Sequence, residues 1–509
     1  MSKPQSEVRI PVRIIISALI LIAEISLIIL AVRFLSEKAL WLYTVAQFIS
    51  IITVIYIVNS RGSVSFKIMW IVFILLIPIL GVLTYTMWGG GRMMPHLKKR
   101  MKKCTDEYIA LLPSGTDIEK TLNYSDMFHS RQAKYLMNDS GYPVYNGTSG
   151  KFYAPGETLM EDLICELEKA EKYIFLEYFI IADGSMWEDI YAVLRKKKKQ
   201  GLEIKIIFDD FGCINHQKSD FVKRVKKDGI EITAFNPIVP ILNIFMNNRN
   251  HRKIIVIDGK VALTGGMNIA DEYVNRIVKH GYWMDSAIML KGKAVDSLLN
   301  MFCTMWKFST GKSIDFNAHK GNCTQENDGF FIPYCDDPLN DKNPAEGIYM
   351  QIINNAQKYV YIATPYLILE TNMVNTLCLA AKSGVDVKII TPHIPDKWYV
   401  HPVTQYYYAE LLEAGVKIFE YTPGFIHSKM FLSDDDVATV GTVNMDYRSF
   451  YMHFECGVWM SGASCINDIR DNFTDILAQS EEIVLEKWKK RKLSLRFKQN
   501  ILHLFSPFM

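Results

Sequence analysis

One pattern of histidine, lysine and aspartate occurs twice in this chain of 509 residues, and the duplication constrains the fold more than any other feature. The first copy reads NHRKIIVIDGKVALTGGMN and the second reads IHSKMFLSDDDVATVGTVN. Both follow the spacing H-x-K-x(4)-D, and they supply His251, Lys253 and Asp258, then His427, Lys429 and Asp434. In both copies an asparagine follows the histidine by 17 positions (268−251 and 444−427). Because chance does not reproduce such offsets twice, the two halves are related by duplication.

The sequence before each copy is also repeated, and it predicts an α/β fold. Residues 163–180, LICELEKAEKYIFLEYFI, correspond to residues 349–368, YMQIINNAQKYVYIATPYLI. Each combines an amphipathic helix with a strand rich in β-branched and aromatic residues. Residues 198–208 and 381–391 repeat a helix that ends at glycine and leads into a buried strand. The same order of helices and strands in both halves predicts two α/β lobes.

The spacing within each copy points to the chemistry of a bound anion. A histidine and a lysine two positions apart on a strand place their side chains on the same face. The imidazole can then attack or protonate a substrate while the ammonium neutralises negative charge. Asn268 and Asn444 follow glycines that allow a ligand to approach closely, and their amides can donate to phosphoryl oxygens. Asp258 and Asp434 come where the strand turns, so they either orient the motif or shape the turn.

Two further carboxylates occupy matching places in the halves. Asp285 begins DSAIML and Glu455 begins ECGVWM. Each is a candidate for holding the Nδ1 of a histidine, which fixes the tautomer and raises the basicity of the ring. The alternative is that both are ordinary surface carboxylates.

Composition limits the partners of the chain. Lys and Arg total 57 against 54 Asp and Glu, a formal net charge of +3, whereas a nucleic-acid groove requires a basic stripe. We therefore expect no nucleic acid partner. The nine cysteines are scattered without the spacing of metal ligands, so we expect reduced thiols and no metal site.

Three apolar runs dominate the first ninety residues, at 14–32, 39–58 and 68–88. Each approaches the roughly 20 residues that a helix needs to cross a bilayer, although Glu24 weakens the first. Lysines and arginines are more numerous on the side that includes residues 92–103. This asymmetry predicts a multi-pass protein of the cell membrane with a cytoplasmic catalytic region.

These observations divide the chain into five parts. We expect a membrane anchor at 1–92, a basic juxtamembrane linker at 93–140, a first lobe at 141–320, a second lobe at 321–482 and a basic amphipathic tail at 483–509. Apolar residues recur in the tail at helical spacing among lysines and arginines. This pattern favours a helix in an anionic membrane interface over a helix packed on the second lobe.

An apolar segment at 238–250 has no counterpart in the second half. Its side chains either form a lip that keeps water from the site or complete the core of the first lobe.

Two H-x-K-x(4)-D motifs followed by G-x-x-N are similar to the signature of the phospholipase D superfamily. The fuller wording NHRKIIVIDG, GGMNIADEY and GTVNMDYRSFYMHFE resembles the bacterial cardiolipin synthases, and the resemblance covers nearly the whole chain. It implies N-terminal transmembrane helices followed by two duplicated phospholipase D-like α/β/α lobes related by a pseudo-twofold axis. It further implies one active site at their junction, without metal or cofactor, in which the two motif triads act and Asn268 and Asn444 bind phosphate.

The same resemblance implies a transferase that condenses two phosphatidylglycerols into cardiolipin and glycerol. One imidazole would attack phosphorus to form a phosphohistidine, while the other protonates the leaving alkoxide and then deprotonates the incoming alcohol. A hydrolytic phospholipase D or another phosphatidyltransferase would use the same residues. A superfamily nuclease fits the charge less well, and a non-catalytic scaffold fits two intact motifs poorly.

Overall fold

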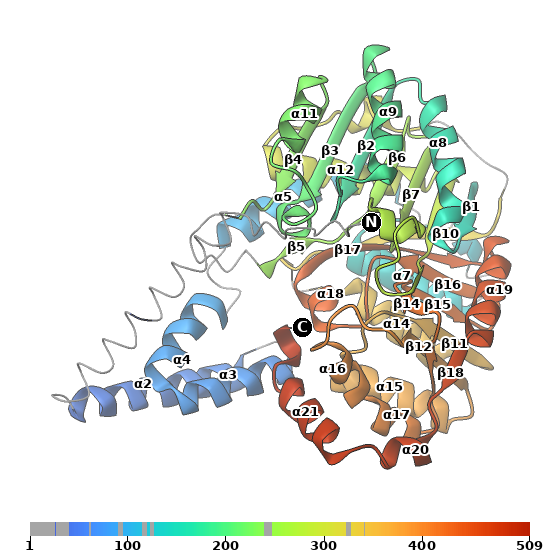
Figure 1. Ribbon diagram of the computed structural model, residues 1–509. Coiled ribbons are helices and arrows are strands. Elements are labelled where there is room, and N and C mark those ends of the chain that lie inside the picture. Colours follow the sequence, from blue (N-terminus) through green and yellow to red (C-terminus); the bar gives the residue numbers. More distant parts are fainter. Residues whose placement is uncertain are drawn as a thin grey trace, which may run out of the picture.

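The computed structural model describes residues 40–60, 63–89, 95–114, 120–122, 127–238, 247–321, 327–340 and 342–508, together with Ser26. Figure 1 shows two lobes, each a β-sheet flanked by helices, with the N-terminal helices α2 (Leu40–Asn59), α3 (Val64–Leu76) and α4 (Pro78–Thr84) beside them.

The first lobe is built on a seven-stranded sheet in the order β1-β9-β7-β6-β2-β3-β4. Its strands are β1 (Thr148–Tyr153), β2 (Tyr173–Tyr178), β3 (Glu203–Asp209), β4 (Glu231–Phe235), β6 (Ile254–Ile257), β7 (Val261–Gly265) and β9 (Ala287–Gly292). Its helices are η3 (Gly156–Leu159), α8 (Met160–Lys169), α9 (Ser185–Lys199), α10 (Asp210–Cys213), α11 (Phe221–Lys227), η5 (Asp271–Val274), α12 (Val295–Thr310) and α13 (Phe316–His319). Strands β2, β3 and β4 are parallel, and every residue of β2 is buried because helices cover both faces.

The second lobe repeats this order as β10-β17-β16-β15-β11-β12-β13, and β18 (Ser480–Glu482) extends its far edge. Its main strands are β10 (Phe330–Asp336), β11 (Tyr359–Ala363), β12 (Asp386–Pro392), β13 (Lys417–Tyr421), β15 (Met430–Ser433), β16 (Val437–Gly441) and β17 (His453–Ser461). Its helices are α14 (Pro344–Asn355), α15 (Thr371–Lys382), α16 (His401–Tyr406), α17 (Tyr408–Glu413), α18 (Tyr447–Tyr451) and α19 (Cys465–Ala478). Here β11, β12 and β13 are the parallel strands. The matching order confirms the prediction of two duplicated α/β lobes.

One continuous apolar core joins the lobes. It runs from one face of the first sheet, where Phe175 stacks on Phe302 of α12 at 4.8 Å between ring centroids, through Phe331 into the second sheet. A second apolar cluster fills the opposite face of the first sheet beneath α8 and α9. The two lobes therefore share one hydrophobic core.

The N-terminal region corrects an expectation. In the described part of the chain, no helix combines the length and the apolar content that crossing a bilayer requires, so the prediction of N-terminal transmembrane helices is wrong. The predicted span at 68–88 is interrupted at Pro78, because proline has no N–H for the helix ladder. Helices α3 and α4 and the π-helix η1 (Tyr85–Gly89) are therefore separate elements. Helices α3 and α4 pack closely, since a Cβ on Gly81 would lie 2.5 Å from the Cα of Ile74.

The multi-pass topology drawn from these segments is not confirmed. The predicted span at 14–32 lies outside the described residues apart from Ser26. The same is true of most of the apolar insertion at 238–250, since positions 239–246 are not described.

The segment expected to be a basic linker contains two packed helices. Helix α5 (Pro95–Ile109) lies on α12. The Tyr108 hydroxyl donates to Ile314 O and accepts from Ile314 N, both at 2.9 Å. Helix α7 (Met127–Ser140) lies on α14, and Gln132 accepts a hydrogen bond from the indole of Trp459 at 2.9 Å. Both helices belong to the body of the molecule.

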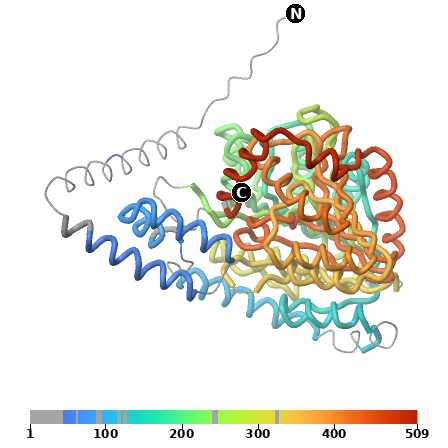
Figure 2. Tube along the Cα trace, turned by 90° about the horizontal axis from the view of Figure 1, so that it is seen from below, coloured from blue at the N-terminus to red at the C-terminus, as the bar shows by residue number. Residues whose placement is uncertain are grey.

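The C-terminal tail forms α20 (Leu485–Lys489), α21 (Leu493–His503) and η6 (Ser506–Phe508). Helix α21 lies against α16, where His503 stacks on Tyr406 at 3.8 Å between ring centroids. The chain end then reaches α18 and α3, and Figure 2 shows the N-terminal helices and the C-terminus on the same side of the molecule.

Candidate active site

Two short strands cross between the lobes immediately before the motif histidines. Strand β5 (Arg249–Asn250) of the first half pairs in parallel with β17 of the second, and His251 N donates to Phe454 O at 2.9 Å. Strand β14 (Gly424–Ile426) of the second half pairs in parallel with β8 (Tyr282–Met284) of the first, and His427 N donates to Met284 O at 2.7 Å. Each motif histidine is therefore held by the backbone of the opposite lobe.

The two candidate carboxylates are exchanged between the lobes in the same way. Glu455 of the second lobe lies 2.9 Å through Oε1 and 3.0 Å through Oε2 from His251 Nδ1. Asp285 of the first lobe lies 2.7 Å through Oδ2 from His427 Nδ1. A carboxylate on Nδ1 fixes the proton there and leaves Nε2 for chemistry. The structure thus brings four predicted residues together, in a pairing across the lobes that the sequence did not specify.

The motif lysines flank the histidines. The Nζ atoms of Lys253 and Lys429 donate to the carbonyl oxygens of His251 and His427, two residues earlier in each case. All four side chains are buried. Burial lowers the pKa of Lys253 to about 8 and that of Lys429 to about 7.

Burial also governs the charge of the imidazoles. Desolvation and the ammonium of Lys253 hold the pKa of His251 well below its usual range, and desolvation with Lys429 lowers the pKa of His427 to about 4. Burial raises the pKa of Glu455, while the ammonium of Lys253 and the hydroxyl of Thr442 favour its charged form. Near neutral pH both rings are therefore uncharged, and Nε2 offers a lone pair.

The motif aspartates lie elsewhere. Asp258 accepts hydrogen bonds from the backbone N–H groups of Glu171, Lys172 and Tyr173 at 2.7–2.8 Å. Asp434 accepts from Gln357, Lys358 and Tyr359 at 2.6–2.9 Å. Each aspartate has a positive φ at the turn after its strand, about 17 Å along an extended chain from the motif lysine. The structure does not bring them to the imidazoles and instead supports the alternative in which they shape the turn.

The motif asparagines lie beside the site. Asn268 accepts from Ile180 N at 3.0 Å and donates to the hydroxyl of Tyr273 at 2.7 Å, and the Tyr273 ring meets His427 edge-on at 5.4 Å between centroids. Asn444 is buried, and its Oδ1 has no hydrogen-bond partner among the described residues. The amide of Asn268 is thus largely occupied within the protein, whereas the unused capacity of Asn444 is that of an acceptor, its Oδ1.

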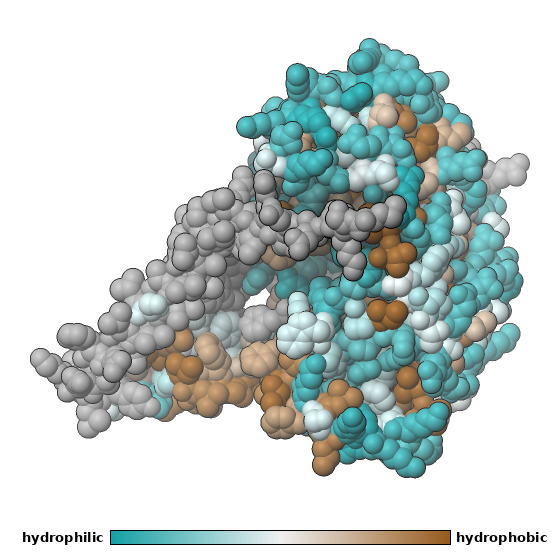
Figure 3. Space-filling model, viewed as in Figure 1, coloured by the Kyte–Doolittle hydropathy of each residue, from teal (hydrophilic) through white to brown (hydrophobic). Residues whose placement is uncertain are grey.

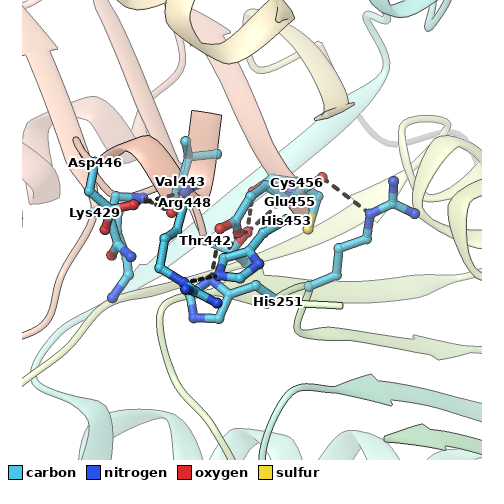
Figure 4. Close-up of polar contacts among 12 residues, drawn as sticks. His251, Lys429, Thr442, Val443, Asp446, Arg448, His453, Glu455 and Cys456 are labelled. Atoms are coloured by element: carbon cyan, nitrogen blue, oxygen red, sulfur yellow. Dashed lines mark hydrogen bonds and ion pairs between the residues drawn. The ribbon is translucent and has the colours of Figure 1, made fainter. Parts of the chain in front are cut away.

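Several residues that the sequence reasoning missed complete the site. Thr442 donates to Glu455 Oε2, whereas the equivalent position in the first half is Gly266, where a Cβ would lie 2.1 Å from Asp285 Oδ1. The sequence did show this difference: the first half has Gly265-Gly266 where the second half has Gly441-Thr442 at the same distance from the motif histidine. His453 and Arg448 also lie next to His251, as Figure 4 shows.

The surroundings of the two histidines differ. Around His427 lie the rings of Tyr273, Trp283 and Phe425, with centroids 5.4–5.8 Å from the imidazole. Around His251 lie Phe179 at 5.0 Å and His453 at 5.7 Å. Within the described residues, no group of three or more His, Cys, Asp or Glu side chains is arranged to hold a metal ion.

Comparisons with known proteins agree with this arrangement. The family model described as "Cardiolipin synthase, PLD-like domain" matches residues 163–306 and 349–477, more than half of the chain. The model described as "Phospholipase_D-nuclease N-terminal" matches residues 48–90.

Relatives span almost the whole sequence. An uncharacterized protein of Streptococcus mutans serotype c is 41% identical over 464 residues, covering 90% of this chain and 99% of that protein. Cardiolipin synthase 1 of Staphylococcus aureus (strain COL) is 33% identical over 471 residues, covering 90% and 94%.

A solved structure shares the fold. The crystal structure of phosphatidylserine synthase from Haemophilus influenzae Rd KW20 covers 74% of this chain and 100% of its own at a TM-score of 0.56 and 13% identity. At that identity the likeness concerns the fold alone. The resemblance seen in the sequence is confirmed by the family model and the relatives, and the chain belongs to the family of cardiolipin synthases with phospholipase D-like domains and is a phosphatidyltransferase.

Proposed function

We propose that this phosphatidyltransferase moves a phosphatidyl group from one phosphatidylglycerol to another, giving cardiolipin and glycerol. The observation that carries the proposal is the pair of buried imidazoles, His251 and His427, each held at Nδ1 by a carboxylate of the opposite lobe. Two such rings allow two-step transfer at one phosphorus, as a hydrolase or a transferase of this family requires. The lobes at 141–320 and 321–482 act jointly in this proposal.

In the first step, Nε2 of one neutral histidine attacks the phosphorus of the donor lipid. The bond from phosphorus to the oxygen of the headgroup glycerol breaks. This departing oxygen takes a proton from the imidazolium of the other histidine. Binding of the anionic phosphodiester raises the pKa of that second ring, which takes up a proton from solution before the attack. The products are a phosphohistidine and free glycerol.

In the second step, a hydroxyl of the acceptor phosphatidylglycerol gives its proton to the now neutral second histidine. Its oxygen attacks phosphorus, the bond from phosphorus to Nε2 breaks, and cardiolipin leaves. Lys253 and Lys429, with the Nδ2 donor of Asn444, stabilise the negative charge that accumulates on the phosphoryl oxygens. The carboxylates Asp285 and Glu455 keep both rings in the productive tautomer.

The lipid substrates place the reaction at a membrane surface containing anionic phospholipid. The exposed apolar residues of the N-terminal and C-terminal helices support this part of the proposal, and Figure 3 shows apolar side chains gathered over α2 and α3.

The experiment is incubation of purified full-length protein with phosphatidylglycerol labelled in the headgroup and in the acyl chains. Cardiolipin and glycerol in equal amounts are expected. Phosphatidic acid as the main product would indicate a hydrolase, and product only after addition of another alcohol would indicate a different acceptor.

His251→Ala and His427→Ala should each lower turnover at least about 1,000-fold, and the double variant should be no worse, because the two rings act as a unit. His96→Ala, at an exposed histidine of α5, is the matched control and should behave as the unaltered protein. Substantial turnover in either folded single variant would contradict the two-histidine site.

A further inference from the structure

The duplication breaks at one position beside the reacting groups. Two residues before the carboxylate, the first half has Trp283 and the second has His453. Because alternate strand residues share a face, each ring lies next to the histidine that the carboxylate holds. Trp283 lies 5.4 Å from His427 and His453 lies 5.7 Å from His251, measured between ring centroids. At this position the first half therefore has an indole, whereas the second half has an imidazole.

Trp283 packs beside His427 and also contacts its carboxylate, since Trp283 Nε1 donates to Asp285 Oδ2 at 3.5 Å. Its ring contacts Tyr273 at 4.7 Å and Phe425 at 4.9 Å between centroids, within the aromatic cluster around His427.

The tautomer of His453 follows from its neighbour. Arg448 Nε donates to His453 Nε2 at 3.3 Å, so Nε2 is the acceptor and the proton of the neutral ring is on Nδ1. Burial and the positive charges of Arg448 and Lys253 keep this ring neutral, since they hold its pKa well below the usual range. His453 thus presents an Nδ1–H donor.

Among the described residues, that donor has no acceptor. His453 Nδ1 is buried and forms no hydrogen bond among the described residues. A buried donor without a partner is unfavourable, and native proteins retain such groups mainly where a ligand or a reaction uses them. Arg448 behind the ring polarises it and makes Nδ1–H a stronger donor.

We propose that His453 is a further catalytic residue, a neutral donor from Nδ1 to a nonbridging oxygen of the phosphodiester, with Arg448 as its positioning residue. The phosphorus has to lie between His251 and His427, so its equatorial oxygens lie within the region that His453 borders. The ligand class is a phosphodiester monoanion, and the inference rests on the proposed function only in requiring attack at phosphorus. It does not depend on which lipid accepts the group.

The test compares three variants that differ in which nitrogen they keep. His453→Asn places an amide N–H near the position of Nδ1, His453→Gln places one near Nε2, and His453→Phe keeps the ring without either nitrogen. Loss of one such donor typically lowers kcat about 100-fold. We expect that loss in the Phe and Gln variants with little change in KM, and recovery to within about tenfold in the Asn variant.

Two substrates separate this role from proton transfer. Turnover is measured with phosphatidylglycerol and with bis(4-nitrophenyl) phosphate, whose leaving group departs without a proton. A donor to a nonbridging oxygen is needed for both substrates, so the loss should persist with the nitrophenyl ester. A loss confined to phosphatidylglycerol would overturn the proposal, because it would assign His453 to the leaving group.

Controls address folding and the proposed function. Thermal unfolding identifies folded variants. Trp283→Phe is the matched aromatic variant: it keeps a ring and removes only a long hydrogen bond to Asp285, which retains its contact with His427, so it is expected to lose far less kcat than His453→Phe. Wild-type kcat in folded His453→Phe, or an equal loss in the Asn and Phe variants, would overturn the proposal. If the unaltered protein makes no cardiolipin yet cleaves the nitrophenyl ester, the proposed function fails while the role of His453 is still measured on that ester.

Discussion

Asp258 and Asp434 belong to the same sequence motif as the reacting histidines, yet each binds three backbone N–H groups at the far end of its strand. A carboxylate that accepts three such bonds ties the strand to the start of its neighbour. The motif therefore has a chemical end and a structural end, and the two should respond differently to substitution.

Asp258→Asn should lower the free energy of unfolding by about 1–3 kcal/mol, since an amide replaces a charged acceptor and turns an N–H toward other donors. The folded fraction should keep a kcat within a few-fold of the unaltered protein. Thermal unfolding and kcat at a temperature below both transitions measure the two effects. A loss of kcat as large as that of His251→Ala, with unchanged stability, would place the aspartate in the reaction instead.

Lys429 makes the reaction sensitive to alkaline pH. Its pKa of about 7 means that the free enzyme loses this ammonium above neutrality, and with it the charge that favours an anionic substrate. We expect kcat/KM to fall from about pH 7 upward. The limb for kcat should lie at higher pH, because the bound phosphodiester favours the protonated amine and raises its pKa.

Lys429→Arg should move the alkaline limb of kcat/KM upward, because a guanidinium stays protonated throughout this range. Its overall activity should be lower than that of the unaltered protein, since the fork geometry differs from an ammonium. Rates between pH 5.5 and 9.5 in detergent micelles measure the profile. An unchanged limb would assign the titration to another group.

Site residues that occupy matching positions in the two halves could be predicted from the sequence. Site residues that differ between the halves could not. Asp285 and Glu455 stood out because they occupy equivalent positions. That each serves the opposite lobe was not predictable, because strand periodicity describes faces within one sheet and says nothing of the β5 and β14 crossings. His453 had no counterpart histidine, so comparison of the halves gave no reason to select it.

At the level of elements, the apolar run at 68–88 shows why hydropathy alone misled. Counting apolar residues treats the run as one helix, whereas Pro78 ends the hydrogen-bond ladder after Leu76 and a new helix begins. The pieces then pack on each other around Trp70, Ile74 and Tyr85. By contrast, the helix and strand order of the lobes was predictable, since each element carried its own periodicity.

The membrane role expected of the tail stays a prediction for helix α21. It touches α16 through His503, while Leu493 and Phe497 are 79% and 68% exposed among neighbouring lysines and arginines. Exposed apolar side chains beside positive charge suit an anionic interface. One part of the tail is thus packed on the second lobe and another part is turned outward, where contact with lipid stays a prediction.

Leu493→Ser with Phe497→Ser should reduce binding to vesicles containing phosphatidylglycerol several-fold, measured by sedimentation at two salt concentrations. The matched control is Ile277→Ser with Val278→Ser, at residues 55% and 78% exposed on the first lobe. Equal binding by both double variants would show that α21 does not contact lipid.

At the scale of the whole molecule, Arg252 links the lobes at the site. Its side chain is 1% exposed, its Nε donates to Glu455 O at 3.1 Å, and its Nη2 donates to Asp336 O at 3.2 Å. The backbone of Glu455, whose carboxylate holds His251, is therefore itself held from the first lobe.

Arg252→Met should lower the free energy of unfolding by about 3 kcal/mol, because buried hydrogen bonds of a charged group are lost at the junction. It should also lower kcat, since Glu455 loses its support. Arg195→Met, at an exposed arginine of α9, should change neither quantity appreciably. Stability loss with full kcat would show that the junction holds the lobes together without aligning the site.

The exchange of carboxylates between the lobes has a consequence for how the protein is made. A ribosome completes His251 well before it reaches Glu455, so the first half leaves the exit tunnel with its imidazole unsupported. We therefore expect a chain that stops before Glu455 to be inactive, since it lacks the carboxylate that holds His251. On this view activity begins only after most of the second lobe has been synthesised, so an unfinished chain would not act on phosphodiesters.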